Sequence, residues 1–371
     1  MVKVKKDKLL LGPKDIKPSS NKFEILGVLN PAAVRLKDGR ILLYIRVVER
    51  LKKTEDSRYF YVPRFAGKNN FKVVIDKFSK SKVTGEDKIA IIFKNDTKRL
   101  TFISHFRRVY LDKSGLKILK IEQKPSFFGL KHDGELGVED PRITKINKKY
   151  YMTYVGLSRR EGISTYLAES DDVIRWKRLG IIFGEQDKDV VLFPEKIKNK
   201  YVCFDRPEGN FEFSTPHIWI AFSPDLIHWG KLDAVNLGGK NKDFSRIGAG
   251  PPPIKTEKGW LQIFHAVTKG VPKGFWISIK KIFGYVYSDL DDYTIWAALL
   301  DKNNPKKLLA KSHLPIIIPK KKYEISFENK KVVFPTGIIQ DRKDILLYNG
   351  VGDKFVSVKK IKLSEIMKNL D

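Results

Sequence analysis

Short apolar runs separated by polar turns follow one another along the chain, and helix-period patterns are rare. One arrangement recurs five times: a proline, an apolar strand, a polar turn and a second strand rich in aromatic or aliphatic residues. Apolar strands on either side of a turn made of Asn, Asp, Gly or charged residues are typical of β-hairpins. The five copies are "NPAAVRLKDGRILLYIRVVER" from Asn30, "EDPRITKINKKYYMTYVG" from Glu139, "FPEKIKNKYVCFDRP" from Phe193, "PPPIKTEKGWLQIFHAV" from Pro251 and "FPTGIIQDRKDILLYNGVGD" from Phe334.

Two of these copies continue in register. "YLAESDDVIRW" places Trp176 35 residues after Pro141, and "IAFSPDLIHW" places Trp229 35 residues after Pro194. A repeat of about 50 residues with four short strands has the size of one propeller blade. We therefore predict an all-β fold, a five-bladed β-propeller, with a two-domain β-sandwich as the alternative.

The predicted propeller takes up the whole chain as a single domain, residues 1–371. With 42% hydrophobic residues, the chain is long enough to bury one large core. We expect an N-terminal extension over about residues 1–25. The C-terminal stretch "KLSEIMKNL" predicts a short amphipathic helix within residues 362–371, capped by Ser364.

The chain is strongly basic, with 72 Lys and Arg against 43 Asp and Glu, a formal net charge of +29. Such a charge raises the alternative of a non-catalytic basic propeller that binds nucleic acid or an acidic glycan. The lysines are spread as short pairs along the chain, without an arginine-rich tail or a recognised nucleic-acid motif. This pattern favours a solvated surface, and we expect no nucleic-acid partner.

The sequence gives no sign of a membrane segment. Its N-terminus has only a three-leucine apolar run before Gly12, which is too short for a signal peptide, and no later segment has the length of a membrane span. The single cysteine, Cys203, has no partner for a disulfide and no metal-binding pattern around it, so we expect it in the core. We predict a cytoplasmic protein with no metal site.

Hairpin geometry brings several polar residues to one edge. The start of a hairpin's first strand and the end of its second strand lie at the same edge of the sheet. The residues that close the second strands are Arg46, Tyr154, Arg206, His265 and Tyr348. Asp140, which precedes a proline, is therefore expected to face a ring with two arginines and a histidine, at the channel mouth where propellers bind ligands.

One acid facing a cluster of cations suits cleavage of a glycosidic bond by an anionic nucleophile. The carboxylic acid can protonate the leaving oxygen while Arg, Lys and His hold a phosphate on the opposite face of the sugar. Phosphate is already nucleophilic, whereas hydrolysis needs a second carboxylate to activate water.

At these residues the sequence resembles glycoside hydrolase family 130, the β-mannoside phosphorylases. The resemblance extends from about residue 30 to residue 353. It is carried by "NPAAVRL", "GVEDPRI" with "YYMTY", "FPEKIKNKYV" with "RP", "IGAGPPPIKTEKGWL" with "FHAV", "YTIWAALLD" and "VVFPTG" with "YNGVGD". It implies an inverting enzyme on a five-bladed propeller, with inorganic phosphate as co-substrate and no cofactor.

The resemblance also implies roles for single residues. Asp140 matches the general acid, which passes its proton through a sugar hydroxyl. The positions that match phosphate-binding residues are Lys188, Arg206 and His265, with Arg46 as a fourth. The positions near the sugar subsites are Asn30, Glu139, Tyr293 and Asp353.

Some positions depart from the family pattern. Asp205 stands before "RP" where a histidine is common, and Trp296 stands where a glycine is expected. Residues 51–112 match the pattern poorly, and the stretch 268–292 is longer and more aromatic than usual.

We expect inverting phosphorolysis of short β-mannosides that releases α-mannose 1-phosphate, with an inverting β-mannoside hydrolase as the alternative on the same fold. The expected partners are a small oligosaccharide and phosphate, with a homo-oligomer possible and no membrane.

Overall fold

The protein is almost entirely β-structure, as the sequence predicts. The computed structural model describes residues 1–86, 89–208, 215–235, 237, 244–268, 292–326 and 329–370. Within these ranges the helical elements are short: η1 (Pro13–Asp15), η2 (Lys80–Lys82), η3 (Lys322–Glu324) and α2 (Leu363–Met367). Most of the aromatic stretch 268–292 lies outside the described residues.

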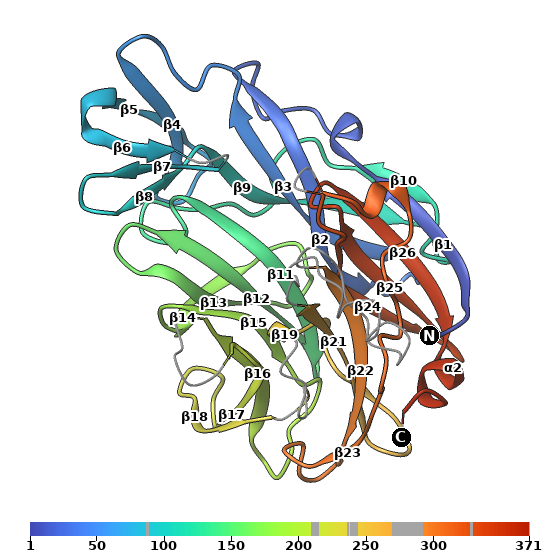
Figure 1. The fold of residues 1–371 in the computed structure, drawn as a ribbon. Coiled ribbons are helices and arrows are strands. Elements are labelled where there is room, and N and C mark those ends of the chain that lie inside the picture. Colours follow the sequence, from blue (N-terminus) through green and yellow to red (C-terminus); the bar gives the residue numbers. More distant parts are fainter. Residues whose placement is uncertain are drawn as a thin grey trace, which may run out of the picture.

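Five antiparallel sheets of four or five strands make up most of the molecule (Figure 1). In order of hydrogen-bonded neighbours, the first sheet is β2 (Phe23–Arg35), β3 (Ile41–Leu51), β9 (Phe102–Leu111) and β10 (Ile118–Ile121), and the second is β11 (Gly137–Ile146), β12 (Lys149–Ser158), β13 (Gly162–Ser170) and β14 (Lys177–Phe183). The third is β15 (Asp187–Leu192), β16 (Tyr201–Pro207), β17 (Trp219–Ser223) and β18 (Gly230–Ala234), and the fourth is β19 (Phe244–Ala249), β21 (Trp260–Thr268), β22 (Tyr293–Leu300) and β23 (Leu308–Lys311), with β20 (Ile254–Lys255) beside β21. The fifth is β24 (Val333–Asp341), β25 (Asp344–Val351), β26 (Phe355–Lys362) and β1 (Val4–Leu11). The first strands are neighbours in space, since β24 contacts β2, β2 contacts β11, β11 contacts β15 and β15 contacts β19.

The two ends of the chain meet in one sheet. The segment predicted as an N-terminal extension contributes β1, which pairs antiparallel with β26 from Val4 opposite Ile361 to Leu11 opposite Val356. The C-terminal helix is present, but Ser364 lies inside it rather than at its cap, which is Lys362 and makes no side-chain capping bond. The prediction of a Ser364 cap is wrong because β26 continues to Lys362 and the helix starts directly at its end.

Residues 51–112, which matched the family pattern poorly, contain a lobe inserted between β3 and β9 (Figure 1). It consists of a two-stranded sheet, β4 (Tyr59–Phe65) and β5 (Val73–Ser79), and a three-stranded sheet, β6 (Val83–Glu86), β7 (Ala90–Phe93) and β8 (Lys98–Leu100). Aromatic contacts fix the lobe, because Phe71 packs edge-on against both Phe65 and Phe128.

The predicted hairpins exist, but two prolines lie elsewhere than expected. In β2, β11 and β24 the proline lies within the first strand, whereas β15 ends at Leu192 before Pro194 and β19 ends at Ala249 before Pro251. The first strand of these two hairpins therefore begins upstream of the quoted copy. The pairing of Lys188 with Arg206 fixes this register in the third copy.

Trp176 and Trp229 end equivalent turns, although the prolines from which their equal spacing is counted differ in place, Pro141 within β11 and Pro194 after β15. Each tryptophan ends a turn in which an aspartate accepts backbone hydrogen bonds, Asp172 from Ile174 and Arg175, and Asp225 from Ile227 and His228. Neighbouring sheets bury their apolar faces against each other, and Cys203 lies fully buried in such a cluster, as predicted.

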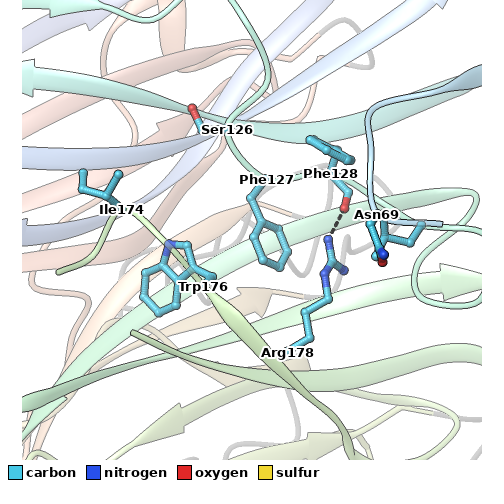
Figure 2. A pocket seen from close by; sticks show the side chains of 8 residues that line it. Asn69, Ser126, Phe127, Phe128, Ile174, Trp176 and Arg178 are labelled. Atoms are coloured by element: carbon cyan, nitrogen blue, oxygen red, sulfur yellow. Dashed lines mark hydrogen bonds between the residues drawn. The ribbon is translucent and has the colours of Figure 1, made fainter. Parts of the chain in front are cut away.

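Two hollows lie away from the predicted site residues. One of about 370 Å³ is lined by aromatic and polar side chains, with the Arg178 guanidinium donating to the Phe128 carbonyl (Figure 2); it is bounded by Asn69, Ser126, Phe127, Phe128, Ile174, Trp176 and Arg178, together with Leu130. The other, of about 690 Å³, has a mostly basic lining that includes Lys5, Arg35, Lys113, Lys343 and Lys360.

Candidate active site

Three of the neighbouring first strands carry an Asn or Asp in a left-handed backbone conformation. The residues are Asn30 (φ 47°), Asp140 (φ 51°) and Asp189 (φ 55°), and each lies where the pairing register with the next strand shifts. Asn and Asp tolerate positive φ better than most residues, and a bulge redirects a side chain from the sheet. The same local device therefore presents three polar side chains from adjacent strands.

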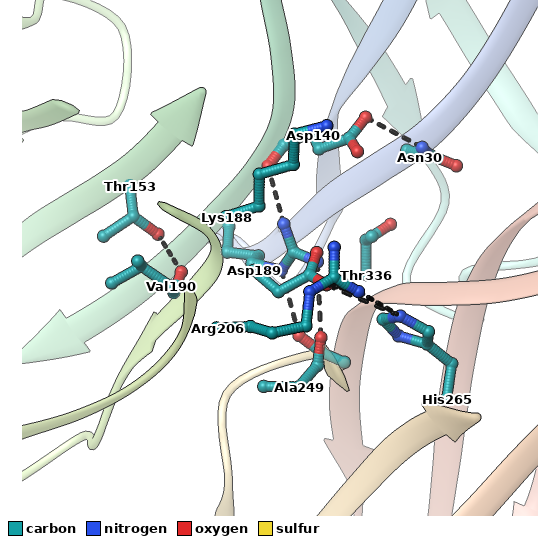
Figure 3. A network of polar contacts seen from close by, with 12 residues as sticks. Asn30, Asp140, Thr153, Lys188, Asp189, Val190, Arg206, Ala249, His265 and Thr336 are labelled. Atoms are coloured by element: carbon teal, nitrogen blue, oxygen red, sulfur yellow. Dashed lines mark hydrogen bonds and ion pairs between the residues drawn. The ribbon is translucent and has the colours of Figure 1, made fainter. Parts of the chain in front are cut away.

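Asp140 and Glu139 form an acidic pair around one arginine. Asp140 Oδ1 accepts hydrogen bonds from Asn30 Nδ2 at 2.8 Å (Figure 3) and from Arg46 Nη1 at 3.0 Å. The other Arg46 nitrogen, Nη2, pairs with Glu139. A Cβ at Gly350 would lie 1.9 Å from Asn30 Oδ1, so this position needs glycine for Asn30 to reach the aspartate.

The two carboxyl groups differ in electrostatic setting. Burial raises the pKa of Glu139 above its usual value against the opposing charge of Arg46, and the nearby Asp140 raises it further. The side chains are partly accessible, 14% for Glu139 and 17% for Asp140, which leaves room for a ligand to reach them. Arg46 compensates both acids, which explains how two carboxyl groups can lie side by side here.

Asp189 is the centre of a second, more deeply buried cluster (Figure 3). Arg142 Nη2 donates to its Oδ1 at 2.7 Å, and Arg206 Nη1 lies 2.9 Å from its Oδ2. His265 Nε2 lies 3.5 Å from the same oxygen. A Cβ at Gly248 would meet this oxygen at 2.2 Å, so the carboxylate and the histidine pack against a bare backbone.

Arg142 joins the two clusters. Its Nη1 donates to the Asp140 carbonyl at 3.0 Å while its Nη2 holds Asp189. The charge of Lys188 also acts on Glu139, whose pKa it lowers. The acidic pair and the Asp189 cluster are therefore parts of one site.

His265 is neutral in this setting. Burial lowers its pKa to about 3; the Asp189 charge opposes that shift, while Arg206 and Arg142 add to it. Its ring packs against Phe334 at 4.3 Å between centroids and stacks with Tyr293 at 6.0 Å. The imidazole can therefore offer a hydrogen bond without adding charge.

Three cations converge on one further carboxylate, that of Glu208. Arg206 Nη2 donates to Glu208 Oε2 at 3.1 Å and Arg246 Nη1 donates to Oε1 at 3.0 Å, while Lys188 Nζ lies 3.4 Å from Oε2. Burial alone would raise the pKa of Glu208, but the charges of the three cations outweigh it and lower that pKa. Three positive groups around one anion are suited to hold a phosphate.

The sequence-predicted residues fall into these two groups. Lys188, Arg206 and His265 lie together around Asp189 and Glu208, whereas Arg46 contacts the acidic pair. Tyr293 stacks on His265, and burial raises the pKa of its hydroxyl. Asp353 is exposed, has φ 52°, and its charge raises the pKa of Arg46.

The predicted ring of five closing residues is wrong in two places. Tyr154 is buried in a core cluster, where its hydroxyl reaches Asp133, and Tyr348 donates to the Gly115 carbonyl inside another cluster. The bulge at residues 140–141 changes which face of the sheet the neighbouring side chains take. Tyr154 lies opposite this bulge, and its side chain points between two sheets.

Four site residues were missed from the sequence: Arg142, Asp189, Glu208 and Arg246. The equal spacing to Trp176 and Trp229 hides Asp189, because it places Phe193 opposite Asp140, whereas the equivalent bulge of β15 lies at Asp189. No pattern marks Glu208 or Arg246.

Asp205 and Trp296, which depart from the family pattern, both point into the core. Trp296 is 8% exposed and donates from Nε1 to Thr294 Oγ1 at 2.9 Å. Asp205 is 1% exposed and shares the strand face of Cys203, opposite to that of Arg206, as strand alternation predicts. Burial raises the pKa of Asp205 to about 7; burial and the Asp205 charge raise the pKa of Asp187 to about 8.

The described part of the chain has no group of three or more His, Cys, Asp or Glu side chains arranged to hold a metal ion. Among the same residues, no helix combines the length and the apolar character needed to cross a bilayer.

Comparisons with known proteins point to β-mannoside phosphorylases. A family model described as β-1,4-mannooligosaccharide phosphorylase matches residues 88–371. A β-1,2-mannobiose phosphorylase from Listeria innocua is 30% identical over 370 residues, covering 98% of this chain and 96% of the relative. A 1,2-β-oligomannan phosphorylase from Thermoanaerobacter sp. is 33% identical over 259 residues, 69% of this chain and 78% of the relative.

A solved structure is similar over nearly the whole chain. The Listeria innocua β-1,2-mannobiose phosphorylase in complex with β-1,2-mannobiose superimposes with a TM-score of 0.82 at 29% identity, covering 97% of this chain and 96% of that one.

The buried pair Asp187 and Asp205 makes a prediction about stability. Because their pKa values in the folded state exceed that of an unfolded aspartate, the protonated pair stabilises the fold at low pH, and this contribution is lost as pH rises through about 7 to 8. We expect Asp205→Asn to weaken this loss, so that the variant gains stability relative to the native protein between about pH 5 and pH 9. Denaturant unfolding at several pH values measures it.

Asp172→Asn is the matched control, because backbone and side-chain hydrogen bonds hold the pKa of Asp172 well below its usual range and its charged partner is an arginine, Arg175. Its effect on the free energy of unfolding should be constant over that pH window. A constant offset for Asp205→Asn as well would contradict the proposed protonation of the pair.

Proposed function

The chain belongs to glycoside hydrolase family 130, the family of β-mannoside phosphorylases, and from this premise we propose that it cleaves short β-mannosides with inorganic phosphate, inverts the anomeric centre and releases α-mannose 1-phosphate. The observation that carries the proposal is the convergence of Lys188, Arg206 and Arg246 on a single anionic group beside the acidic pair. An anion site of this kind suits a phosphate nucleophile.

We propose that the five larger sheets are the blades of a five-bladed propeller that forms one domain over residues 1–371. The adjacency of β24, β2, β11, β15 and β19 supports this arrangement, since the first strands of propeller blades line the central channel. The β1 strand then belongs to the last blade, and the lobe of β4–β8 is an insertion in the first.

Asp140 is the proposed general acid. Its Oδ1 is fixed by Asn30 and Arg46, while no hydrogen bond within the described residues reaches Oδ2. In the reaction a phosphate oxygen bonds to the anomeric carbon as the bond to the glycosidic oxygen breaks, and that oxygen takes the Asp140 proton by way of a sugar hydroxyl. Asn30, Glu139, Tyr293 and Asp353 are proposed to contact the sugar.

The proposed phosphate cradle consists of Lys188, Arg206, His265 and Arg246. Neutral His265 would contribute a hydrogen bond, and the cations would contribute charge. Arg46 is proposed to lie between phosphate and acid, held by its pairing with Glu139 and Asp140.

The first linkage to test is β-1,2, because the Listeria innocua relative that aligns with 98% of this chain is named for it. The family model carries the name of the β-1,4 activity, so a panel of mannobioses should include both linkages.

An inverting hydrolase is the second candidate, because Glu208 adds a further carboxylate to the site of Asp140, and such an enzyme needs one as a base for water. The dependence on phosphate separates the two. We expect no mannose release when phosphate is rigorously removed, and α-mannose 1-phosphate when it is present, as ³¹P and ¹H NMR would show.

For the general acid, we predict that Asp140→Asn lowers turnover by about 10²- to 10⁴-fold, because the amide keeps the shape and loses the proton. The rate of β-mannobiose phosphorolysis measures the effect, and the unfolding midpoint verifies the fold. Glu139→Gln serves as the neighbouring comparison and should affect mainly the KM for the mannoside. Near-native turnover in Asp140→Asn would reject the assignment.

For the phosphate cradle, we predict that Lys188→Ala raises the KM for phosphate about ten- to a hundred-fold, the effect of losing one charge-assisted contact. Lys188 is preferable to Arg206 because its side chain is 30% exposed, whereas removing Arg206 would deprive the buried Asp189 of one of its two arginine partners.

Lys200→Ala, at the exposed turn that joins the other ends of β15 and β16, is the control with the same change of charge. It should leave the KM for phosphate as it is in the native enzyme. If Lys188→Ala and Lys200→Ala had the same KM for phosphate, Lys188 would not belong to the phosphate cradle.

A further inference from the structure

We propose that Glu208 is an internal competitor of phosphate: in the free enzyme its carboxylate occupies the cation cluster, and phosphate binding displaces it. This inference rests on the proposed function, since it assumes that Lys188, Arg206 and Arg246 form the phosphate cradle. It assigns to Glu208 the control of how much phosphate the enzyme needs.

The contacts place the carboxylate where an anion would bind. Its two oxygens are divided among cations from three strands, Oε2 between Arg206 on β16 and Lys188 on β15, and Oε1 with Arg246 on β19. A tetrahedral phosphate would bind the same nitrogen atoms, because all three donor groups point toward the position of one carboxylate.

The charge of Glu208 is fixed at the pH where phosphorolysis would run. The three cations lower its pKa below the usual glutamate value despite burial, so the side chain is a carboxylate wherever phosphate is a dianion. Two such anions on the same cations repel each other, and one of them must leave.

Glu208 and Asp189 differ in how readily phosphate could displace their carboxylates from the cations. Asp189 is only 4% exposed, sits within a strand and is held by Arg142 and Arg206 from opposite sides. Glu208 follows the end of β16 and is 19% exposed, and its backbone N–H donates to the Gln186 carbonyl. Among the described residues its side chain pairs only with the three cations that phosphate would take over. Asp189 is therefore a permanent counter-ion, and Glu208 has the freedom to turn away.

The competition has a use in the free enzyme. Without an anion, three cations held this close would repel one another, and other small anions would bind. A tethered carboxylate keeps the cations in place and admits only an anion that binds them more strongly than it does.

The test is Glu208→Gln, which keeps the size of the side chain and removes its charge. We expect the KM for phosphate to fall about ten-fold, the change for removing one charge-assisted competitor, and the affinity for inorganic phosphate measured by calorimetry without mannoside to rise by the same factor. Inhibition by sulfate should strengthen as well, because the competitor acts on any anion.

Glu195→Gln is the matched control. Glu195 also pairs with a lysine, Lys255, and its replacement changes the net charge equally, but its side chain is 45% exposed and lies outside the cluster. Its KM for phosphate should equal that of the native enzyme, which excludes an effect of total charge. If Glu208→Gln fails to fold, Glu208→Asp retains the charge on a shorter arm that cannot reach all three cations, and a smaller fall in KM is expected.

The outcomes separate this inference from the proposed function. If native enzyme makes α-mannose 1-phosphate but Glu208→Gln has an equal or higher KM for phosphate, Glu208 only positions the cations and the inference fails alone. If native enzyme releases free mannose without phosphate and Glu208→Gln loses that release, Glu208 is a base for water, and both the inference and the phosphorylase proposal fail.

Discussion

The buried carboxylate of Asp189 is the interaction on which the rest of the site depends. Arg142 and Arg206 are both nearly inaccessible to water, and buried guanidinium groups are costly unless a counter-ion compensates them. Asp189 compensates both, and its pKa is lowered, against burial, by Arg206 and Arg142. Because Arg142 also holds the backbone of Asp140, this one carboxylate connects the position of the acid to the position of the anion site.

A repeated backbone device explains how a sheet protein builds such a site. At Asn30, Asp140 and Asp189 the first strand of a sheet bulges into the left-handed region, and the three strands are neighbours. Only the side chains differ. The Asn30 amide donates a hydrogen bond, Asp140 is a partly exposed acid that a ligand can reach, and Asp189 is a buried counter-ion. The repeat thus supplies equivalent positions, and burial at each decides what its carboxylate or amide does.

The sequence could predict the hairpins, because period-2 apolar strands and polar turns are local features. Motifs single out Asp140, Lys188, Arg206 and His265, which the fold brings close together. It placed the third and fourth first strands too late, since Pro194 and Pro251 follow their strands instead of lying within them. Because Asp189 lies upstream of the predicted start of its strand, it was not recognised as a site residue. Glu208 and Arg246 could not be found, because their meeting depends on how β16 and β19 approach in space, and Tyr154 was misplaced because a bulge changes which face a residue takes.

The net charge of +29 contributes little to this chemistry. Across the two joined clusters the cationic side chains are Lys188, Arg46, Arg142, Arg206 and Arg246, and the carboxyl groups are Glu139, Asp140, Asp189 and Glu208. His265 is neutral, so the free site is nearly balanced. Exposed charges farther than about 10 Å away are screened by salt, whereas these buried groups are not. A site balanced by one fixed and one replaceable carboxylate takes up an anion by exchange, so its affinity depends on the difference between phosphate and Glu208 rather than on the total positive charge of the protein.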